Sequence, residues 1–212
     1  MAVRCDATDR RQVKDGVGQT LDAYGRIDLL VNGAGGSRRE TTTTEELEFA
    51  DIDTDEMLRT VCLNYLSAVV ASQEVGRIFA REKQGAIVNI ASVAGLSPLS
   101  RALSYSDGKA ALVSTTKWLA VHMAREYSPQ IRVNAVAPGF ILTDQNRFLL
   151  VDEETGESTE RGRDVLDHVP QRRLGSAGEI APAVLWLLSE RASFVTGAVI
   201  PIDGGFSADG GV

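Results

Sequence analysis

Short apolar runs alternate with longer amphipathic segments along most of the chain, and this alternation constrains the fold more than any other feature. Runs rich in Val, Ile and Leu predict strands near 2–5, 28–32, 86–90, 131–136 and 197–200. Helical periodicity predicts helices near 9–24, 54–83, 102–127 and 176–189. Strands that alternate with helices of this length form parallel sheets covered on both faces, so we expect a doubly wound α/β fold.

The composition excludes several classes of protein. The 212 residues are enough for one domain, and 43% of them are hydrophobic, so a substantial core can form. A net charge of −7 argues against nucleic acid or anionic membranes as partners, because both attract basic surfaces. Cys5 and Cys62 are too few for a disulfide framework, and we expect no metal site. No apolar stretch is long enough to span a bilayer, so the cytoplasm is the expected location.

Tyr105 and Lys109 stand four residues apart in a predicted helix, and Ser92 follows the apolar run before it. Residues at i and i+4 share one face of a helix, so the Lys109 ammonium can lie beneath the Tyr105 phenol. A fixed positive charge favours the phenolate and would lower the pKa of the tyrosine from its usual value of about 10. Such a tyrosine can exchange a proton with an alcohol or carbonyl oxygen. Taken alone, however, a Tyr and a Lys four residues apart occur often by chance on an amphipathic helix, so the pair by itself does not establish this chemistry.

Further motifs surround this pair in a fixed order. They comprise Asn32, Gly33, Ala34 and Gly35 after the second predicted strand, Asn64 in the long helix, Pro138 and Gly139 after the fourth strand, and Thr143. Together with Ser92, Tyr105 and Lys109, these motifs resemble the short-chain dehydrogenase/reductase family over nearly the whole chain. The resemblance implies a single Rossmann-like domain over residues 1–212 that uses NAD or NADP to oxidise an alcohol or reduce a carbonyl group.

The same resemblance implies the roles of the catalytic residues. Tyr105 would be the acid and base, while Lys109 would bind the nicotinamide ribose and lower the pKa of Tyr105. Ser92 would hold the substrate oxygen, and Asn64 would support a water molecule in a proton relay.

The cofactor residues follow from the resemblance as well. Those implied on the adenosine side are Asn32, Gly33, Ala34 and Gly35; those implied near the nicotinamide are Pro138, Gly139 and Thr143. A glycine at position 108 costs about 1 kcal/mol relative to alanine inside a helix. We interpret Gly108 as tolerated, or as allowing close approach of the cofactor.

The chain lacks the family's opening strand, Gly-rich turn and helix, which hold the cofactor pyrophosphate. Residues 2–9 resemble the family's third strand and the turn after it, where Asp6 would contact the adenine. Asp6 and Asp9 are equal candidates for a plain helix N-cap. We therefore expect a sheet without the first βαβ unit, an unpaired edge on the run 28–31, and poor dinucleotide binding. The sequence does not distinguish NAD from NADP.

Residues 140–173 form the one long segment without clear periodicity, and they follow a strand end where open α/β sheets bind ligands. We predict a substrate lid there. Residues 138–150 and 203–207 resemble a branch of the family that interconverts D-fructuronate and D-mannonate, which implies a sugar acid as substrate. Arg38 and Arg147 are candidate partners for its carboxylate, or else solvated surface residues.

Two alternatives remain open. One is a 3-oxoacyl-type or other polyol reductase of the same family. The other is a catalytically silent fragment that serves as an oligomerising module, since the helices near 54–83 and 102–127 pair subunits in this family. In either case the resemblance implies a homodimer or homotetramer.

Overall fold

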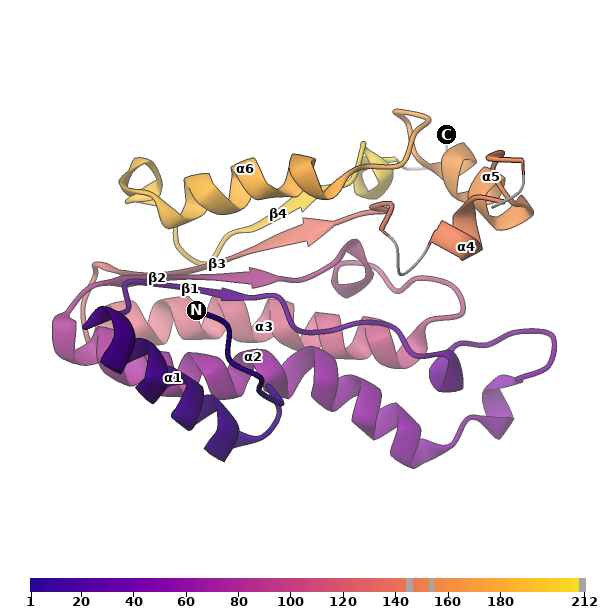
Figure 1. Cartoon of the computed structure of the whole chain (residues 1–212). Helices are drawn as coiled ribbons and strands as arrows, with labels where there is room; N and C mark the ends of the chain where they lie inside the picture. The colour runs from indigo at the N-terminus through magenta and orange to yellow at the C-terminus, as the bar shows by residue number, and fades with distance from the viewer. Residues whose placement is uncertain (144–146, 153–154, 210–212) are drawn as a thin grey trace.

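The structure, a computed structural model, describes residues 1–143, 147–152 and 155–209, which form a three-layer α/β arrangement (Figure 1). A parallel sheet forms the middle layer. Helices α1 (Arg10–Tyr24), α2 (Thr54–Glu82) and α3 (Leu103–Glu126) cover one face, and α6 (Ala177–Leu188) covers the other. The predicted doubly wound α/β fold is confirmed.

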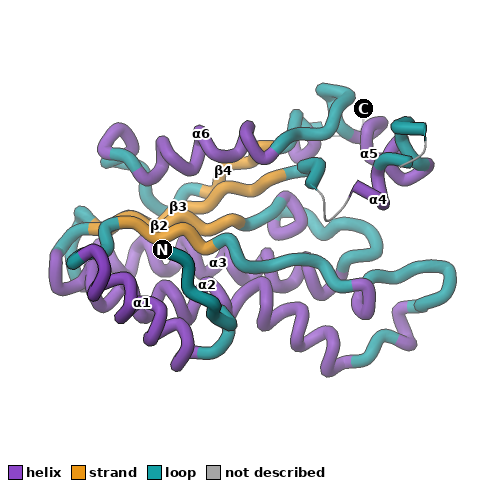
Figure 2. The backbone as a smooth tube through the Cα atoms, in the orientation of Figure 1, coloured by secondary structure: helices purple, strands orange, loops and turns teal. Residues whose placement is uncertain are grey.

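The sheet contains β1 (Leu29–Asn32), β2 (Gly85–Ile90), β3 (Ile131–Pro138) and β4 (Val199–Ile202), in that spatial order. The strands lie side by side in the middle of the molecule (Figure 2). Each neighbouring pair is parallel, so the carboxyl ends of all four strands lie at one edge of the sheet, as the arrows in Figure 1 show. These strands lie close to four of the predicted runs. The four helices agree with the prediction to within one residue at each end.

The strand predicted near 2–5 does not form. The Asp6 carboxylate accepts hydrogen bonds from the Thr8 amide at 2.8 Å and the Thr8 hydroxyl at 2.7 Å, so this segment bonds locally. A strand persists only when its backbone groups find a neighbouring strand, and none lies beside these residues. Strand β1 is therefore an edge of the described sheet, and its Leu29 and Val31 side chains are 50% and 46% exposed.

Local sequence explains where the helices begin. The Asp53 carboxylate accepts hydrogen bonds from the amides of Asp55 and Glu56 and so caps α2. Asp9 does the same for α1, accepting from the amides of Arg11 and Gln12. The cap of α1 is therefore Asp9 and not Asp6.

The core has one apolar layer on each face of the sheet. Phe79, Ile87 and Met123 belong to the layer under α2 and α3, whereas Val88 and Leu187 belong to the layer under α6. The adjacent residues Ile87 and Val88 point to opposite faces and are both fully buried. This burial on both faces explains the continuous apolar run that the sequence shows there.

Residues 140–173 are more regular than the sequence suggests. They contain α4 (Arg147–Leu150) and α5 (Glu160–His168), which lie beyond the carboxyl ends of β3 and β4 (Figure 1). Leu150, Val165 and Val169 form a buried cluster of their own in this segment. The predicted lid also includes residues 144–146 and 153–154, which lie outside the described residues.

Within the described ranges, no helix is long and apolar enough to cross a membrane. In the same ranges, no three His, Cys, Asp or Glu side chains gather where they could hold a metal ion.

Candidate active site

Ser92, Tyr105 and Lys109 meet at the carboxyl edge of the sheet. Ser92 follows β2 and precedes the short 3-10 helix Val93–Gly95, while Tyr105 and Lys109 lie in the first two turns of α3. The side chain of Ser92 lies beside that of Tyr105 and acts on its pKa. The Lys109 Nζ atom lies 5.8 Å from the centre of the Tyr105 ring. The structure therefore brings these three predicted catalytic side chains together.

Gly95 sets the distance between the Ser92 turn and α3. A Cβ atom on Gly95 would lie 2.6 Å from the carbonyl oxygen of Lys109, far inside van der Waals contact. Only a residue without a side chain allows the two backbones to approach so closely. This contact holds Ser92 at the level of Tyr105.

Lys109 is buried and is held by a backbone group. Its Nζ atom donates a hydrogen bond to the carbonyl oxygen of Ile90 at 2.8 Å, and the residue is 4% exposed. Burial disfavours the charged form and lowers the pKa of Lys109 to about 8. An ammonium has three N–H donors, and this contact uses one. The others can donate to a hydroxyl of a bound molecule.

The pKa of Tyr105 is raised, which corrects the expectation that Lys109 lowers it. Burial is the main cause, and the nearby Ser92 side chain opposes it only in part. The Lys109 ammonium lies near the ring and bonds to Ile90, and it is not among the causes of the shift. Tyr105 is therefore protonated at neutral pH and is suited to donating a proton.

Asn64 connects α2 to the turn after β1. Its Nδ2 atom donates to the carbonyl oxygens of Gly36 at 2.8 Å and Thr60 at 2.9 Å, and its Oδ1 atom accepts from the Gly36 amide at 2.9 Å. The side chain is fully buried and its amide group is committed to these backbone partners. The predicted role of Asn64 in a proton relay stays a prediction.

The turn after β1 passes directly over Asn64 and Lys109. A Cβ atom on Gly35 would lie 2.7 Å from the Asn64 Oδ1 atom and 3.1 Å from the Lys109 Nζ atom. Gly33, Ala34 and Gly35 are exposed, so their backbone can face a ligand. Asn32 is buried instead, and its Nδ2 atom donates to Ser72 Oγ and to Asn89 Oδ1.

A buried polar chain was missed by the sequence reasoning. Asn89 accepts from Asn32 at 2.8 Å and donates to the Thr116 hydroxyl at 2.8 Å, which joins β1, β2 and α3 beneath the site. The signal in the sequence is an Asn at the end of each of two apolar strands. The register places these two residues side by side.

Gly108 allows close approach of a helix rather than of the cofactor. A Cβ atom on Gly108 would lie 2.8 Å from the Asn64 Cβ atom and 3.3 Å from the Val61 carbonyl oxygen. Both groups belong to α2. Gly108 is therefore where α2 and α3 pack most closely beside the site.

The remaining predicted cofactor residues lie at the same edge of the sheet or near the N-terminus. The Gly139 amide donates to the Ile202 carbonyl oxygen at 3.0 Å, just after Pro138 ends β3. Thr143 is exposed, and its carbonyl oxygen accepts from the amide of Arg147 at 3.0 Å. Asp6 is exposed and bonds to Thr8, apart from these residues in sequence.

The two candidate carboxylate-binding arginines differ. The Arg38 guanidinium already pairs with Glu56 at 3.1 Å and Glu40 at 3.6 Å. Arg147 is exposed at the start of α4. A substrate carboxylate would have to compete with two protein carboxylates at Arg38, so Arg147 is the better candidate.

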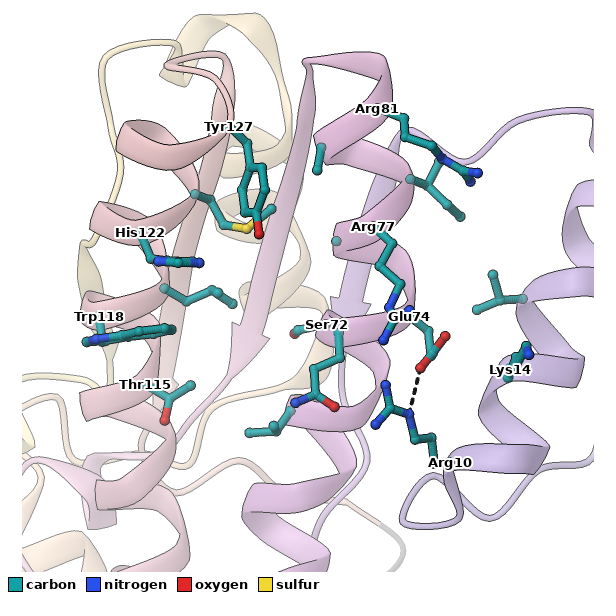
Figure 3. Close-up of a pocket in the computed structure, with 18 of the residues that line it drawn as sticks. Arg10, Lys14, Ser72, Glu74, Arg77, Arg81, Thr115, Trp118, His122 and Tyr127 are labelled. Carbon is teal, nitrogen blue, oxygen red and sulfur yellow. Dashed lines mark hydrogen bonds and ion pairs between the residues drawn. The ribbon is translucent and has the colours of Figure 1, made fainter.

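A groove of about 1250 Å³ lies elsewhere, on the outer side of α2 between α1 and α3 (Figure 3). Trp118, His122 and Tyr127 form its α3 wall, with Trp118 stacked on His122 at 4.7 Å between ring centres. Arg77 and Arg81 of α2 and Arg10 and Lys14 of α1 line the rest of it, and Arg10 pairs with Glu74 of α2 at 2.8 Å. Ser92, Tyr105 and Lys109 do not line it, so this groove is not the catalytic cleft.

Comparison with known proteins identifies the family. Residues 1–207 match the family described as enoyl-(acyl carrier protein) reductase. UxuB of Bacillus subtilis (strain 168), an uncharacterized oxidoreductase, is 36% identical over 220 residues, covering 100% of this chain and 78% of that protein.

Solved structures agree with this assignment. A candidate D-mannonate oxidoreductase from Haemophilus influenza with bound NAD superposes with a TM-score of 0.92 at 34% identity, covering 100% of this chain and 78% of that one. ElxO with NADP bound gives a TM-score of 0.80 at 31% identity, covering 96% and 77% of the two chains. With this ancestry and with Ser92, Tyr105 and Lys109 in one site, the chain belongs to the short-chain dehydrogenase/reductase family.

Proposed function

We propose that this protein is an NAD(P)-dependent oxidoreductase that interconverts a carbonyl and a secondary alcohol, with Ser92, Tyr105 and Lys109 as its catalytic residues. The observation that carries this proposal is the buried Lys109 ammonium 5.8 Å from the centre of the Tyr105 ring, with the Ser92 side chain beside that tyrosine. Two hydroxyl groups converge there at the carboxyl edge of a parallel sheet, where ligands bind in folds of this kind.

Each of the three side chains has its own role in the proposed reaction. Ser92 and Tyr105 donate hydrogen bonds to the substrate oxygen and stabilise the charge that develops on it. Tyr105 then gives its proton to that oxygen, and a positioned acid contributes roughly 10²–10⁴-fold to the rate. The Lys109 ammonium has donors left for a ribose hydroxyl.

A nicotinamide dinucleotide would supply or accept the hydride, and the residues present fit its nicotinamide ribose half. The exposed backbone of Gly33, Ala34 and Gly35 lies beside Lys109, and a side chain at Gly35 would collide with the Asn64 and Lys109 side chains. Pro138, Gly139 and Thr143 are the proposed nicotinamide side, and Asp6 the proposed adenine contact. We propose NAD or NADP without choosing between them, since the relatives above were solved with either.

The proposed substrate is a sugar acid such as D-fructuronate or its product D-mannonate, in line with the description of the Haemophilus relative. Residues 140–173 would cover it as a lid on a single domain over residues 1–212. The exposed Arg147 on this segment would bind the substrate carboxylate through a two-pronged fork. We propose the cytoplasm as the location, where such a substrate would be met.

The deciding experiment compares D-fructuronate with the matching neutral ketose in NADH and NADPH oxidation assays. We expect faster reduction of the acid, and we expect Arg147→Ala to remove most of the preference. Arg191→Ala is the control, since Arg191 is exposed after α6. Equal rates for acid and neutral sugar would contradict the carboxylate site. Activity on acyl thioesters alone would favour the 3-oxoacyl alternative.

We further propose that the protein is a homo-oligomer paired through α2 and α3. The outer faces of these helices expose apolar side chains, among them Leu58, Leu66, Trp118 and Val121. The groove beside them is basic, whereas residues 45–56 contain seven carboxylates and no Lys or Arg. The acidic segment of one copy therefore matches the basic groove of another. A catalytically silent module would keep this pairing without turnover, which the assays above distinguish.

A further inference from the structure

The turn formed by residues 203–208 after β4 contacts both ends of the segment proposed to cover the substrate. At the first end, the Gly139 amide donates to the Ile202 carbonyl oxygen, and a Cβ atom on Gly139 would lie 2.6 Å from the Asp203 Cβ atom. At the other end, the Gln171 amide donates to the Gly204 carbonyl oxygen at 3.1 Å. The segment therefore leaves the sheet and returns beside the same turn.

Close packing fixes the second contact. Gly204 has φ +64° and a Cβ atom there would lie 2.9 Å from the Val169 Cγ1 atom. Gly205 has φ +94° and lies against Pro170, with 3.1 Å between its Cβ position and the proline ring. Side chains are disfavoured at both positions by the backbone conformation and by the neighbours.

The Asp203 carboxylate holds the turn in shape. It accepts from the amides of Gly205 at 3.0 Å and Ser207 at 2.9 Å. Burial alone would raise the pKa of this carboxyl, but these hydrogen bonds outweigh it and the pKa is lowered. The turn is thus a preformed structure and not a loose tail.

Phe206 joins this turn to the apolar cluster of the segment. Its ring meets the Phe140 ring edge to face, with 5.2 Å between centres. Phe140 and Phe206 both pack against the buried Leu150, Val165 and Val169, which come from α4, α5 and the residue after α5. An aromatic pair of this geometry contributes about 0.5–1.5 kcal/mol beyond its buried area.

We propose that Phe206 is a positioning residue: through Phe140 and the Leu150–Val165–Val169 cluster, the turn at 203–208 holds the segment carrying α4 and α5 at the carboxyl edge of the sheet. The consequence for substrate binding rests on the proposed function, because it assumes that this segment covers the substrate. The contact between the turn and this segment does not depend on the proposed function. Loss of the Phe206 ring should loosen α5 while the sheet and α3 stay intact.

Hydrogen exchange measured by mass spectrometry on the full chain tests the link directly. Phe206→Ala should raise amide exchange in residues 160–168 about tenfold, with exchange in β2 and β3 unchanged. Phe194→Ala is a matched control, because the Phe194 side chain is fully exposed and should leave exchange in α5 unaltered. Phe206→Leu keeps most of the volume and should give a smaller increase in the same residues.

Steady-state kinetics with the sugar acid test the consequence for substrate binding. Phe206→Ala should raise KM for the sugar acid about tenfold while kcat and dinucleotide affinity change by less than about twofold. Unchanged exchange in α5 in both Phe206 variants would overturn the proposal. If the Phe206 variants exchange faster in α5 but the wild-type protein reduces no carbonyl compound, the role of Phe206 in positioning α5 is supported and the proposed function is refuted. If Phe206→Ala does not fold, the Phe206→Leu exchange pattern decides the question alone.

Discussion

Lys109 donates a hydrogen bond from its Nζ atom to the carbonyl oxygen of Ile90 at 2.8 Å, which ties α3 to the end of β2. The bond leads the lysine side chain into the protein and leaves the ammonium 5.8 Å from the centre of the Tyr105 ring. Burial there lowers the pKa of Lys109 and raises that of Tyr105. The two shifts determine how both groups are protonated near neutral pH.

Lys109→Met should change how stability depends on pH. The pKa of Lys109 falls from 10.5 to about 8 in the folded protein, so between these values the unfolded chain holds a proton that the folded chain has lost. Stability then rises with pH in the wild type but not in the variant. Urea unfolding at pH 7 and pH 10 should show a gain for the wild type on the order of 1–3 kcal/mol.

Lys117→Met is the control for this measurement, because Lys117 is exposed on the same helix. It should show the same gain as the wild type between the two pH values, because it retains Lys109. The free energies of unfolding of the wild type and Lys109→Met could instead differ by the same amount at both pH values. That result would mean that Lys109 is solvated in the folded protein.

Tyr105→Phe should abolish carbonyl reduction and leave dinucleotide affinity largely intact, because only the hydroxyl is lost. The expected loss in rate is at least about 10²-fold, measured by steady-state kinetics beside a dinucleotide titration. The raised pKa of Tyr105 also implies that this hydroxyl stays protonated throughout the neutral range. Tyr127→Phe should be silent, since Tyr127 is exposed beyond α3. Retention of most of the rate in Tyr105→Phe would remove Tyr105 from its role.

Gly108→Ala should destabilise the protein although alanine is the better helix former. The added Cβ atom would lie 2.8 Å from the Asn64 Cβ atom and would separate α2 from α3. Overpacking of this kind costs typically 1–3 kcal/mol, which exceeds the gain of about 1 kcal/mol in helix propensity. Gly18→Ala in α1 is the matched control: no atom lies within 4 Å of its Cβ position, so stability should rise. Equal thermal shifts for the two variants would contradict the packing argument.

Arg77→Glu combined with Arg81→Glu should weaken self-association, because these residues supply positive charge to the groove beside α2. Adding Glu45→Lys and Glu48→Lys to the same chain should restore part of it, since the charges of the two surfaces are then exchanged. Sedimentation velocity over a range of concentrations measures both effects, with Arg191→Glu as the control away from the groove. A monomeric wild type at every concentration would refute the proposed pairing.

The sequence by itself determined the elements and the order of the motifs. Periodicity near 54–83 and 102–127 gave α2 and α3 almost to the residue, because helix boundaries depend on local patterns and caps such as Asp53. The spacing of Tyr105 and Lys109 placed both side chains near one another before any tertiary contact was known. The run 2–5 failed because a strand depends on a neighbour that the local pattern does not supply.

Only the tertiary structure decided what surrounds those residues. The partner of Lys109 is a backbone carbonyl, which no residue type reveals, and the direction of the Tyr105 shift depends on burial by segments far away in the chain. Gly108 serves the contact between α2 and α3, and Arg38 is paired with Glu40 and Glu56. Local propensity is encoded residue by residue, whereas desolvation and close packing arise only when distant segments meet.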